Sequence, residues 1–152
     1  MTRLIAVAIA ASAVILSGCG LFGAKGAPPP LKVSITASSR LNPDDEGNAL
    51  PTLVRVYQLA SPARARSAEL GDLLRDPKAV LAEDLLSVEE LQLTPGAKLD
   101  RTLPREQTAR AVLIAAVVRR PAGESWKDVV ELPASKSPPL AYLVEEYRLS
   151  RR

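Results

Sequence analysis

The stretch that decides the fold is Ala111-Val-Leu-Ile-Ala-Ala-Val-Val118, eight consecutive apolar residues rich in valine and isoleucine. A strand with one solvent-exposed face alternates apolar and polar residues, whereas a strand covered on both faces is apolar throughout. We therefore expect residues 111–118 to form a central strand in which Val112, Ile114 and Val118 are nearly fully buried.

Shorter strand-like segments lie on both sides of this stretch. Residues 31–37 alternate apolar and polar side chains, the period of two that indicates one buried face. Further strands are expected at 53–59, 87–93, 98–103, 126–132 and 141–149. Prolines and Thr94-Pro95-Gly96 punctuate them, because proline has no N–H to donate to a ladder. The pattern predicts a mainly β protein, a sandwich of about seven or eight strands.

A different pattern follows the second expected strand. Ser67 is placed to cap a helix that carries Leu70, Leu73 and Leu74 on one face. Asp76-Pro77 has the form of an N-cap followed by the favoured first-turn proline of a second helix. We expect two short helices inserted after strand two.

The N-terminus has the pattern of a lipoprotein signal peptide. Arg3 precedes an uncharged apolar run over residues 4–16, which is short for a transmembrane helix, since about 20 apolar residues are needed to span a bilayer. The run ends in Leu16-Ser17-Gly18-Cys19, which resembles the bacterial lipobox, where the cysteine is acylated and the bond before it is then cleaved. We expect residues 1–18 to be the signal peptide and Cys19 the lipid attachment site.

Cys19 is the only cysteine of the chain, although secreted proteins ordinarily use cysteines in disulfide pairs. Lipidation explains the single thiol, and the two or three acyl chains of such lipoproteins, at ~0.8 kcal/mol per buried methylene, anchor a protein stably. Gly20 stands where an Asp commonly signals inner-membrane retention. We expect a tether over 19–30, a β-sandwich domain over 31–152, and an outer-membrane protein on the periplasmic face.

The composition argues against common enzymes. The chain has no histidine, and its cysteine is expected to carry lipid, which excludes Ser-His-Asp and Cys-His nucleophiles and the usual zinc ligand sets. A carboxylate-only glycosidase using Asp44, Asp45 and Glu46 is the remaining enzymatic alternative. Acidic residues in a Pro/Asn/Gly loop are more often solvated turn formers, so we expect no enzyme and no cofactor.

Metal and nucleic-acid sites are not indicated either. Asn42, Asp44, Glu46 and Gly47 superficially mimic the start of an EF-hand loop, but the twelfth position is Leu53 where a bidentate Glu is required. The net charge of +3 is spread along the chain, and three Tyr, one Trp and one Phe offer few stacking platforms for nucleic acid.

Several segments together carry a family resemblance. They are Asn42-Pro43-Asp44-Asp45-Glu46-Gly47, Pro51-x-x-Val54-Arg55-Val56-Tyr57-Gln58-Leu59, the Leu-rich stretch near 70–86, Thr94-Pro95-Gly96, and Trp126 after residues 115–119. This set resembles the TssJ family, also called SciN or VasD, the outer-membrane lipoproteins of type VI secretion systems. The resemblance implies a transthyretin-like β-sandwich with small helical insertions.

The resemblance also implies a role in assembly. Members of the family bind the periplasmic domain of the inner-membrane protein TssM and so join the TssJ-TssL-TssM complex. The binding segment in the family is the loop between the first two strands, which corresponds here to residues 38–52, and the matching residues are Asn42, Pro43, Asp44, Gly47 and Pro51.

This chain departs from the family pattern in two places. Residues 48–51 are Asn-Ala-Leu-Pro, without the Arg that often precedes the proline, and the helical insertion contains only aliphatic side chains where aromatics are frequent. We therefore expect an interface fitted to its own TssM. The alternative is a generic outer-membrane lipoprotein binding module, such as a pilotin or a ligand-binding sandwich, although a carbohydrate platform would need more aromatics.

Overall fold

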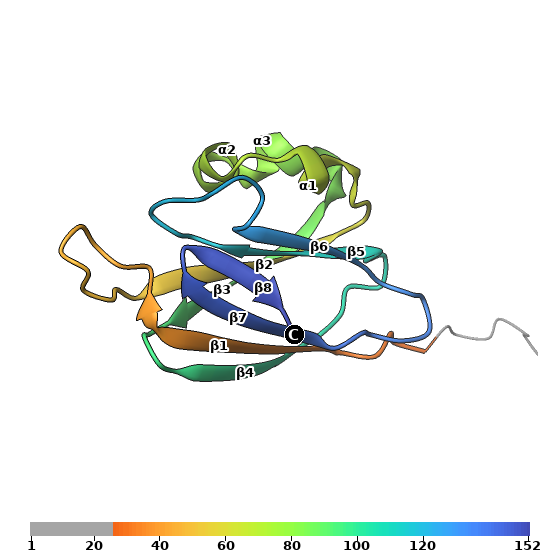
Figure 1. The fold of residues 1–152 in the computed structure, drawn as a ribbon. Coiled ribbons are helices and arrows are strands. Elements are labelled where there is room, and N and C mark those ends of the chain that lie inside the picture. The colour runs from red at the N-terminus through yellow and green to blue at the C-terminus, as the bar shows by residue number, and fades with distance from the viewer. Residues whose placement is uncertain (1–25) are drawn as a thin grey trace, which may run out of the picture.

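The computed structural model describes residues 26–152. The expected signal peptide, the expected lipid site at Cys19 and the first half of the expected tether lie outside the described residues. The described chain forms eight strands in two four-stranded sheets, with three short helices on one side (Figure 1). The predicted mainly β fold is confirmed.

The elements follow one another as β1 (Leu31–Leu41), β2 (Thr52–Leu59), α1 (Ala63–Ser67), α2 (Leu70–Arg75), α3 (Pro77–Leu81), the 3-10 turn η1 (Ala82–Asp84), β3 (Leu85–Leu93), β4 (Lys98–Leu103), β5 (Ala111–Ala116), β6 (Lys127–Glu131), β7 (Leu140–Glu146) and β8 (Arg148–Arg151). One sheet has the order β4-β1-β7-β8 and the other β3-β2-β5-β6. β1 lies parallel to β7, and the other strand pairs of the described chain are antiparallel.

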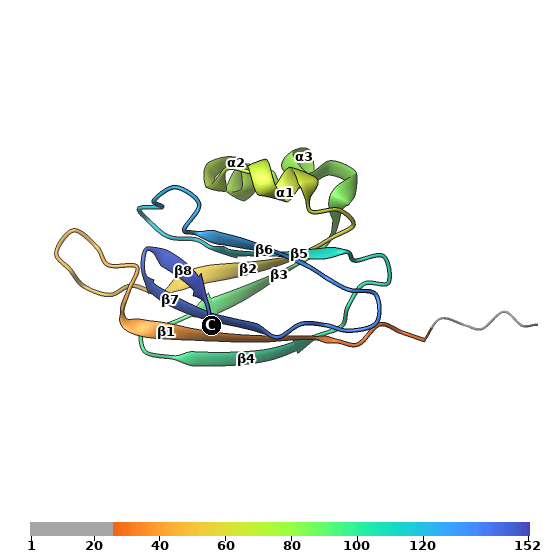
Figure 2. The same ribbon diagram turned by 45° about the vertical axis from the view of Figure 1, so that its right-hand side comes forward.

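The core confirms the role expected of residues 111–118. All six residues of β5 are buried, and Val112 and Ile114 are fully inaccessible, with Val118 at 5% exposure. β5 lies between β2 and β6, and the helices cover the face of this sheet that points away from the other sheet (Figures 1 and 2). Both faces of β5 are therefore covered, which explains its uninterrupted apolar sequence.

A buried lysine of the sheet binds the end of the first helix of the insertion. The ammonium of Lys127 in β6 donates to the carbonyls of Arg66 and Ala68 at the C-terminal end of α1, at 2.9 and 2.7 Å, and pairs with Glu124 at 2.7 Å. Its side chain is only 4% exposed. The last carbonyl groups of α1, which have no hydrogen-bond partner within the helix, thus accept hydrogen bonds from the charged side chain of a β6 residue.

The insertion contains three short helices, where the sequence predicted two. Asp76 caps α3 as expected, with its carboxylate accepting from the N–H of Ala79 at 3.0 Å. The expected cap at Ser67 is wrong, because this residue ends α1 and its hydroxyl donates to the carbonyl of Arg64. α2 begins after Glu69 without a side-chain cap, and Leu70 and Leu73 anchor it by burial.

Two expected strand limits differ from the structure. Residues 38–41 extend β1 across a register irregularity and bury Leu41 completely, so the loop before β2 spans only residues 42–51. The expected single strand 141–149 is a hairpin that turns at Glu146, whose φ is 48°. The turn contains no glycine or proline, so nothing in the sequence marked it.

The strand directions separate the connections into two ends of the sandwich. The β1–β2 loop, the β5–β6 loop and the β7–β8 turn lie at one end, and the described chain begins at the other (Figure 1). The strands and the buried core lie within residues 31–151. No helix among the described residues has the length and hydropathy needed to cross a bilayer.

Candidate functional site

The β1–β2 loop, residues 42–51, projects from the sandwich beyond the strand ends (Figures 1 and 2). Its base is closed by a backbone hydrogen bond from Leu50 N–H to the carbonyl of Leu41, at 3.0 Å. The loop is exposed over residues 45–48, whereas Ala49 and Leu50 are half-buried.

Asn42 fixes the base of the loop to two neighbouring segments. Its side-chain oxygen accepts from the N–H of Arg119 at 2.8 Å, and its own N–H donates to the carbonyl of Glu146 at 2.9 Å. Asn42 is only 5% exposed and has a φ of 44°, a left-handed conformation that asparagine tolerates better than most residues. Asn42 therefore turns the chain at the start of the loop and links the loop by hydrogen bonds to the β5–β6 loop and the β7–β8 turn.

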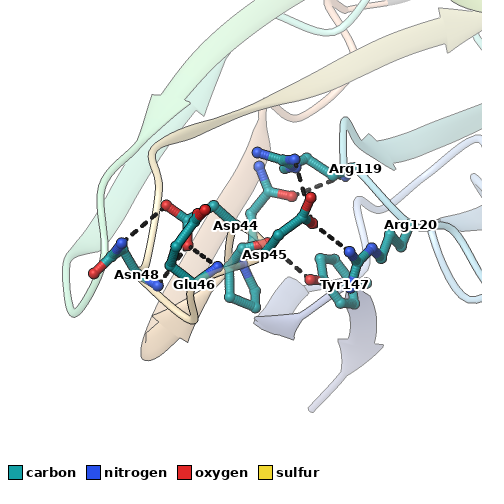
Figure 3. Close-up of polar contacts among 9 residues, drawn as sticks. Asp44, Asp45, Glu46, Asn48, Arg119, Arg120 and Tyr147 are labelled. Atoms are coloured by element: carbon teal, nitrogen blue, oxygen red, sulfur yellow. Dashed lines mark hydrogen bonds and ion pairs between the residues drawn. The ribbon is translucent and has the colours of Figure 1, made fainter.

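Asp44 organises the tip of the loop (Figure 3). One carboxylate oxygen accepts from the N–H groups of Glu46 and Asn48, at 3.0 and 2.7 Å, and the other accepts from the Asn48 side chain at 3.0 Å. The side-chain hydrogen bond from Asn48 holds the pKa of Asp44 below its ordinary value. Gly47, with a φ of 86°, supplies the left-handed turn between them. The tip is thus ordered by its own side chains.

A second set of contacts ties the loop to the β5–β6 loop and the β7–β8 turn. Asp45 pairs with Arg120 and lies 3.7 Å from the guanidinium of Arg119. The hydroxyl of Tyr147 donates to the carbonyl of Pro43 at 2.7 Å, and the Arg120 guanidinium lies 5.8 Å from the centre of the Tyr147 ring (Figure 3). Three segments distant in sequence therefore form one surface.

The residues expected from the sequence all lie on this loop, with different environments. Asn42 is buried, Pro43 and Asp44 are half-buried, and Gly47 and Pro51 are exposed. The sequence did not indicate Arg119, Arg120 or Tyr147. Arg119 and Arg120 directly follow the expected strand 111–118, and Tyr147 lies within the expected strand 141–149.

The arrangement does not favour the carboxylate chemistry considered as an alternative. The Asp44 carboxylate is engaged by three donors and the Asp45 carboxylate by arginines, and the lowered pKa of Asp44 is opposite to what a general acid requires. Among residues 26–152 no cluster of three or more His, Cys, Asp or Glu is arranged to hold a metal ion.

A shallow hollow of about 220 Å³ adjoins the loop. It is lined by charged groups of β1, the β5–β6 loop and the β7–β8 turn, with Arg40 bridging Glu145 and Glu146 at 3.2 Å each. This open, charged hollow differs from the enclosed, mostly apolar pockets that hold small molecules.

The fold is a two-sheet β-sandwich from which an ordered loop projects. The model of the type VI secretion lipoprotein family, which includes VasD, EvfM and TssJ, matches residues 29–147, and the chain belongs to this family. The predicted family resemblance is confirmed. No curated protein matches the sequence.

Solved structures support the same fold. The lipoprotein TssJ1 of the type VI secretion system of Pseudomonas aeruginosa is 22% identical, with a TM-score of 0.73 over 82% of this chain and 97% of that chain. A chain of a structure described as a type VI membrane complex is 23% identical, with a TM-score of 0.75 over 82% and 98%. A chain of a structure described as the TssM C-terminal domain from EAEC is 23% identical, with a TM-score of 0.67 over 81% and 97%.

Proposed function

We propose that this lipoprotein is an outer-membrane anchor of a type VI secretion membrane complex and that it binds the periplasmic domain of TssM through the β1–β2 loop. The observation that carries the proposal is the loop itself, which projects from the sandwich and is nevertheless ordered by internal hydrogen bonds. Long ordered loops on a rigid scaffold are disproportionately sites of recognition.

The order of the loop matters for affinity. A flexible loop loses conformational freedom when it binds, and this cost subtracts from the interaction free energy. Here the Asp44 network and the Tyr147 contact hold the loop in one conformation before the partner arrives. Binding therefore proceeds with little ordering cost.

The anchoring residues and the contacting residues differ in this proposal. Asn42, Pro43, Asp44 and Gly47 shape the loop, and Asp45 ties it to Arg120. Glu46 and Pro51 are exposed, and Leu50 is half-buried. In this proposal Leu50 and Pro51 supply apolar contact area, and Glu46 at the exposed tip supplies a charge that selects a complementary surface on TssM.

The family and the solved structures support a membrane complex as the setting. The family consists of type VI secretion lipoproteins, and related chains occur in structures described as a type VI membrane complex and a TssM C-terminal domain. In this proposal Cys19 carries the lipid after removal of residues 1–18, and residues 19–30 tether the domain to the periplasmic face of the outer membrane. TssL is joined through TssM.

The alternative function is a generic lipoprotein binding module such as a pilotin. That alternative predicts no affinity for TssM and no dependence on the β1–β2 loop. The two functions are therefore separated by one binding experiment.

The experiment replaces residues 44–48 with two glycines. The closure is geometrically feasible because the Asp44 N–H and the Asn48 carbonyl oxygen lie 2.9 Å apart. We expect binding of the TssM periplasmic domain, measured by calorimetry, to be lost, with the melting temperature within a few degrees because an exposed loop contributes little burial.

A matched control replaces Gln107 and Thr108 with glycine. Both are exposed in the connection before β5, away from the loop. This variant should bind TssM like the parent chain. Unchanged affinity in the shortened variant would mean that the interface lies elsewhere, and absence of binding by the parent chain would favour the alternative module.

A further inference from the structure

We propose that the end of the sandwich where the described chain begins is a docking surface for anionic phospholipid headgroups. The inference rests on the proposed lipid anchor, which brings this end of the domain to the membrane. Four exposed basic residues, Lys32, Arg101, Arg110 and Lys136, occupy this end. They are dispersed in the sequence, and the fold gathers them.

The strand register and the connections place the four at the same end of the sandwich as the start of β1. Lys32 is the second residue of β1, and Arg101 of β4 pairs with Val33. The N–H of Arg110 donates to the carbonyl of Leu59 at the end of β2, at 2.8 Å.

Lys136 is held directly beside the incoming chain. The hydroxyl of its neighbour Ser137 donates to the carbonyl of Pro29 at 2.7 Å. The Lys136 carbonyl accepts from the buried guanidinium of Arg105 at 3.0 Å, and the same guanidinium bonds the Pro133 carbonyl at 2.8 Å. The connection that carries Lys136 is therefore fixed to the domain.

The pairing of charges differs between the two ends. Within residues 26–152, none of the four basic side chains, nor Arg105, lies within ion-pair distance of a carboxylate. At the loop end, by contrast, Arg40, Arg119 and Arg120 each pair with acidic residues.

Nearby acids do not neutralise this surface. Glu131 pairs with Arg66 of α1, and Asp100 of β4 pairs with Lys98. Glu106 is exposed and adds one negative charge against the four positive charges of the basic residues. The surface therefore keeps an excess of positive charge.

Anionic headgroups fit this surface because they present many negative charges at the place to which the tether leads. Each basic side chain close to an anionic leaflet favours the docked state by roughly fivefold. The four charges are exposed and distributed over this end, with Lys32 and Arg101 beside an open hollow of about 310 Å³, and this distribution suits a surface that presents many phosphates. Docking at this end directs the β1–β2 loop away from the membrane and toward the periplasm (Figure 1).

The test uses the mature lipidated chain reconstituted in vesicles of phosphatidylcholine, with or without phosphatidylglycerol. Lysines are acetylated with an amine-reactive reagent and quantified by mass spectrometry. We expect acetylation of Lys32 and Lys136 to fall by about threefold or more in the anionic vesicles. Lys78 on α3, which is also exposed, serves as the control within the same molecule and should not change.

The protection should depend on salt and on the basic residues. Raising the ionic strength from 0.1 M to 1 M shortens the screening length from about 10 Å to about 3 Å. The protection of Lys32 and Lys136 from acetylation should then disappear. The variant Arg101→Gln/Arg110→Gln should show weaker protection of Lys136, whereas Arg75→Gln/Arg148→Gln, with the same charge change elsewhere, should not.

Vesicle flotation distinguishes a failure of the headgroup docking from a failure of the lipid anchor. A chain that floats with both kinds of vesicle but shows equal acetylation in them overturns the headgroup docking and leaves the anchor standing. An equal fall in the acetylation of Lys78 also overturns the headgroup docking, because the protection would not be confined to this end of the sandwich. A chain that floats with neither overturns the lipid anchor, and the docking falls with it.

Discussion

Replacing Ile114 with alanine tests the core on which the binding loop is mounted. Ile114 is fully buried in the middle of β5, where it pairs with Val56 of β2 and Asp128 of β6. The substitution removes three side-chain carbons and leaves a cavity between the sheets. Such replacements cost about 2–5 kcal/mol, and the tight strand pairing on both sides favours the upper part of this range because the site collapses little.

The assay is urea unfolding of a chain beginning at residue 26, which we expect to fold alone because the core lies within β1–β8. The midpoint should fall while the dependence on urea stays constant. Val88→Ala is the control, because Val88 lies on the edge strand β3 and is 45% exposed. A loss below about 0.5 kcal/mol for Ile114→Ala would refute the central position assigned to β5.

Three further results are expected. Cys19→Ser should leave an uncleaved precursor without lipid, and palmitate labelling that survives it would refute the lipid site. Tyr147→Phe removes the hydrogen bond to Pro43, worth about 1 kcal/mol, and should weaken TssM binding by about fivefold with the melting temperature nearly unchanged; unchanged affinity would show that this contact does not position the loop. The pKa of Asp44 lies below its ordinary 3.8, so its carboxylate favours the ordered loop above that pH and the effect is lost as pH falls through the folded-state pKa. Because the chain has no histidine, the melting temperature of the free domain should be constant from about pH 5 to 8, and a midpoint near pH 6 would contradict this.

The predictable part of the fold is the part set by local periodicity. The uninterrupted run in β5 and the alternation at the start of β1 were both correct, because each depends only on which faces are covered. The Asp76-Pro77 helix start was also correct, since its capping hydrogen bond is local.

The parts that could not be predicted depend on tertiary contacts. The turn at Glu146 has no glycine or proline, and the structure shows Arg40 of β1 bridging Glu145 and Glu146 there. The end of β1 looked like a loop because residues 38–40 are polar, yet Leu41 is buried beyond them. Local sequence patterns do not indicate which residues far apart in the chain come into contact.

In the candidate site, too, the local contacts could be predicted from the sequence and the tertiary contacts could not. The Asp44 network spans only a few residues, and the Asn/Pro/Asp/Gly composition of the loop indicated a turn. The contribution of Tyr147 comes from a residue 104 positions away from Pro43. Only the three-dimensional structure brings that side chain to the loop.

The most direct test of the central claim is photo-crosslinking of the lipidated chain to the TssM periplasmic domain. A photoreactive amino acid is placed at Glu46 on the exposed loop tip, and in separate variants at Lys78 on α3 and Lys136 at the opposite end, all three exposed. We expect a cross-link to TssM from position 46 and none from positions 78 and 136. A cross-link from 78 or 136 with none from 46 would contradict this expectation.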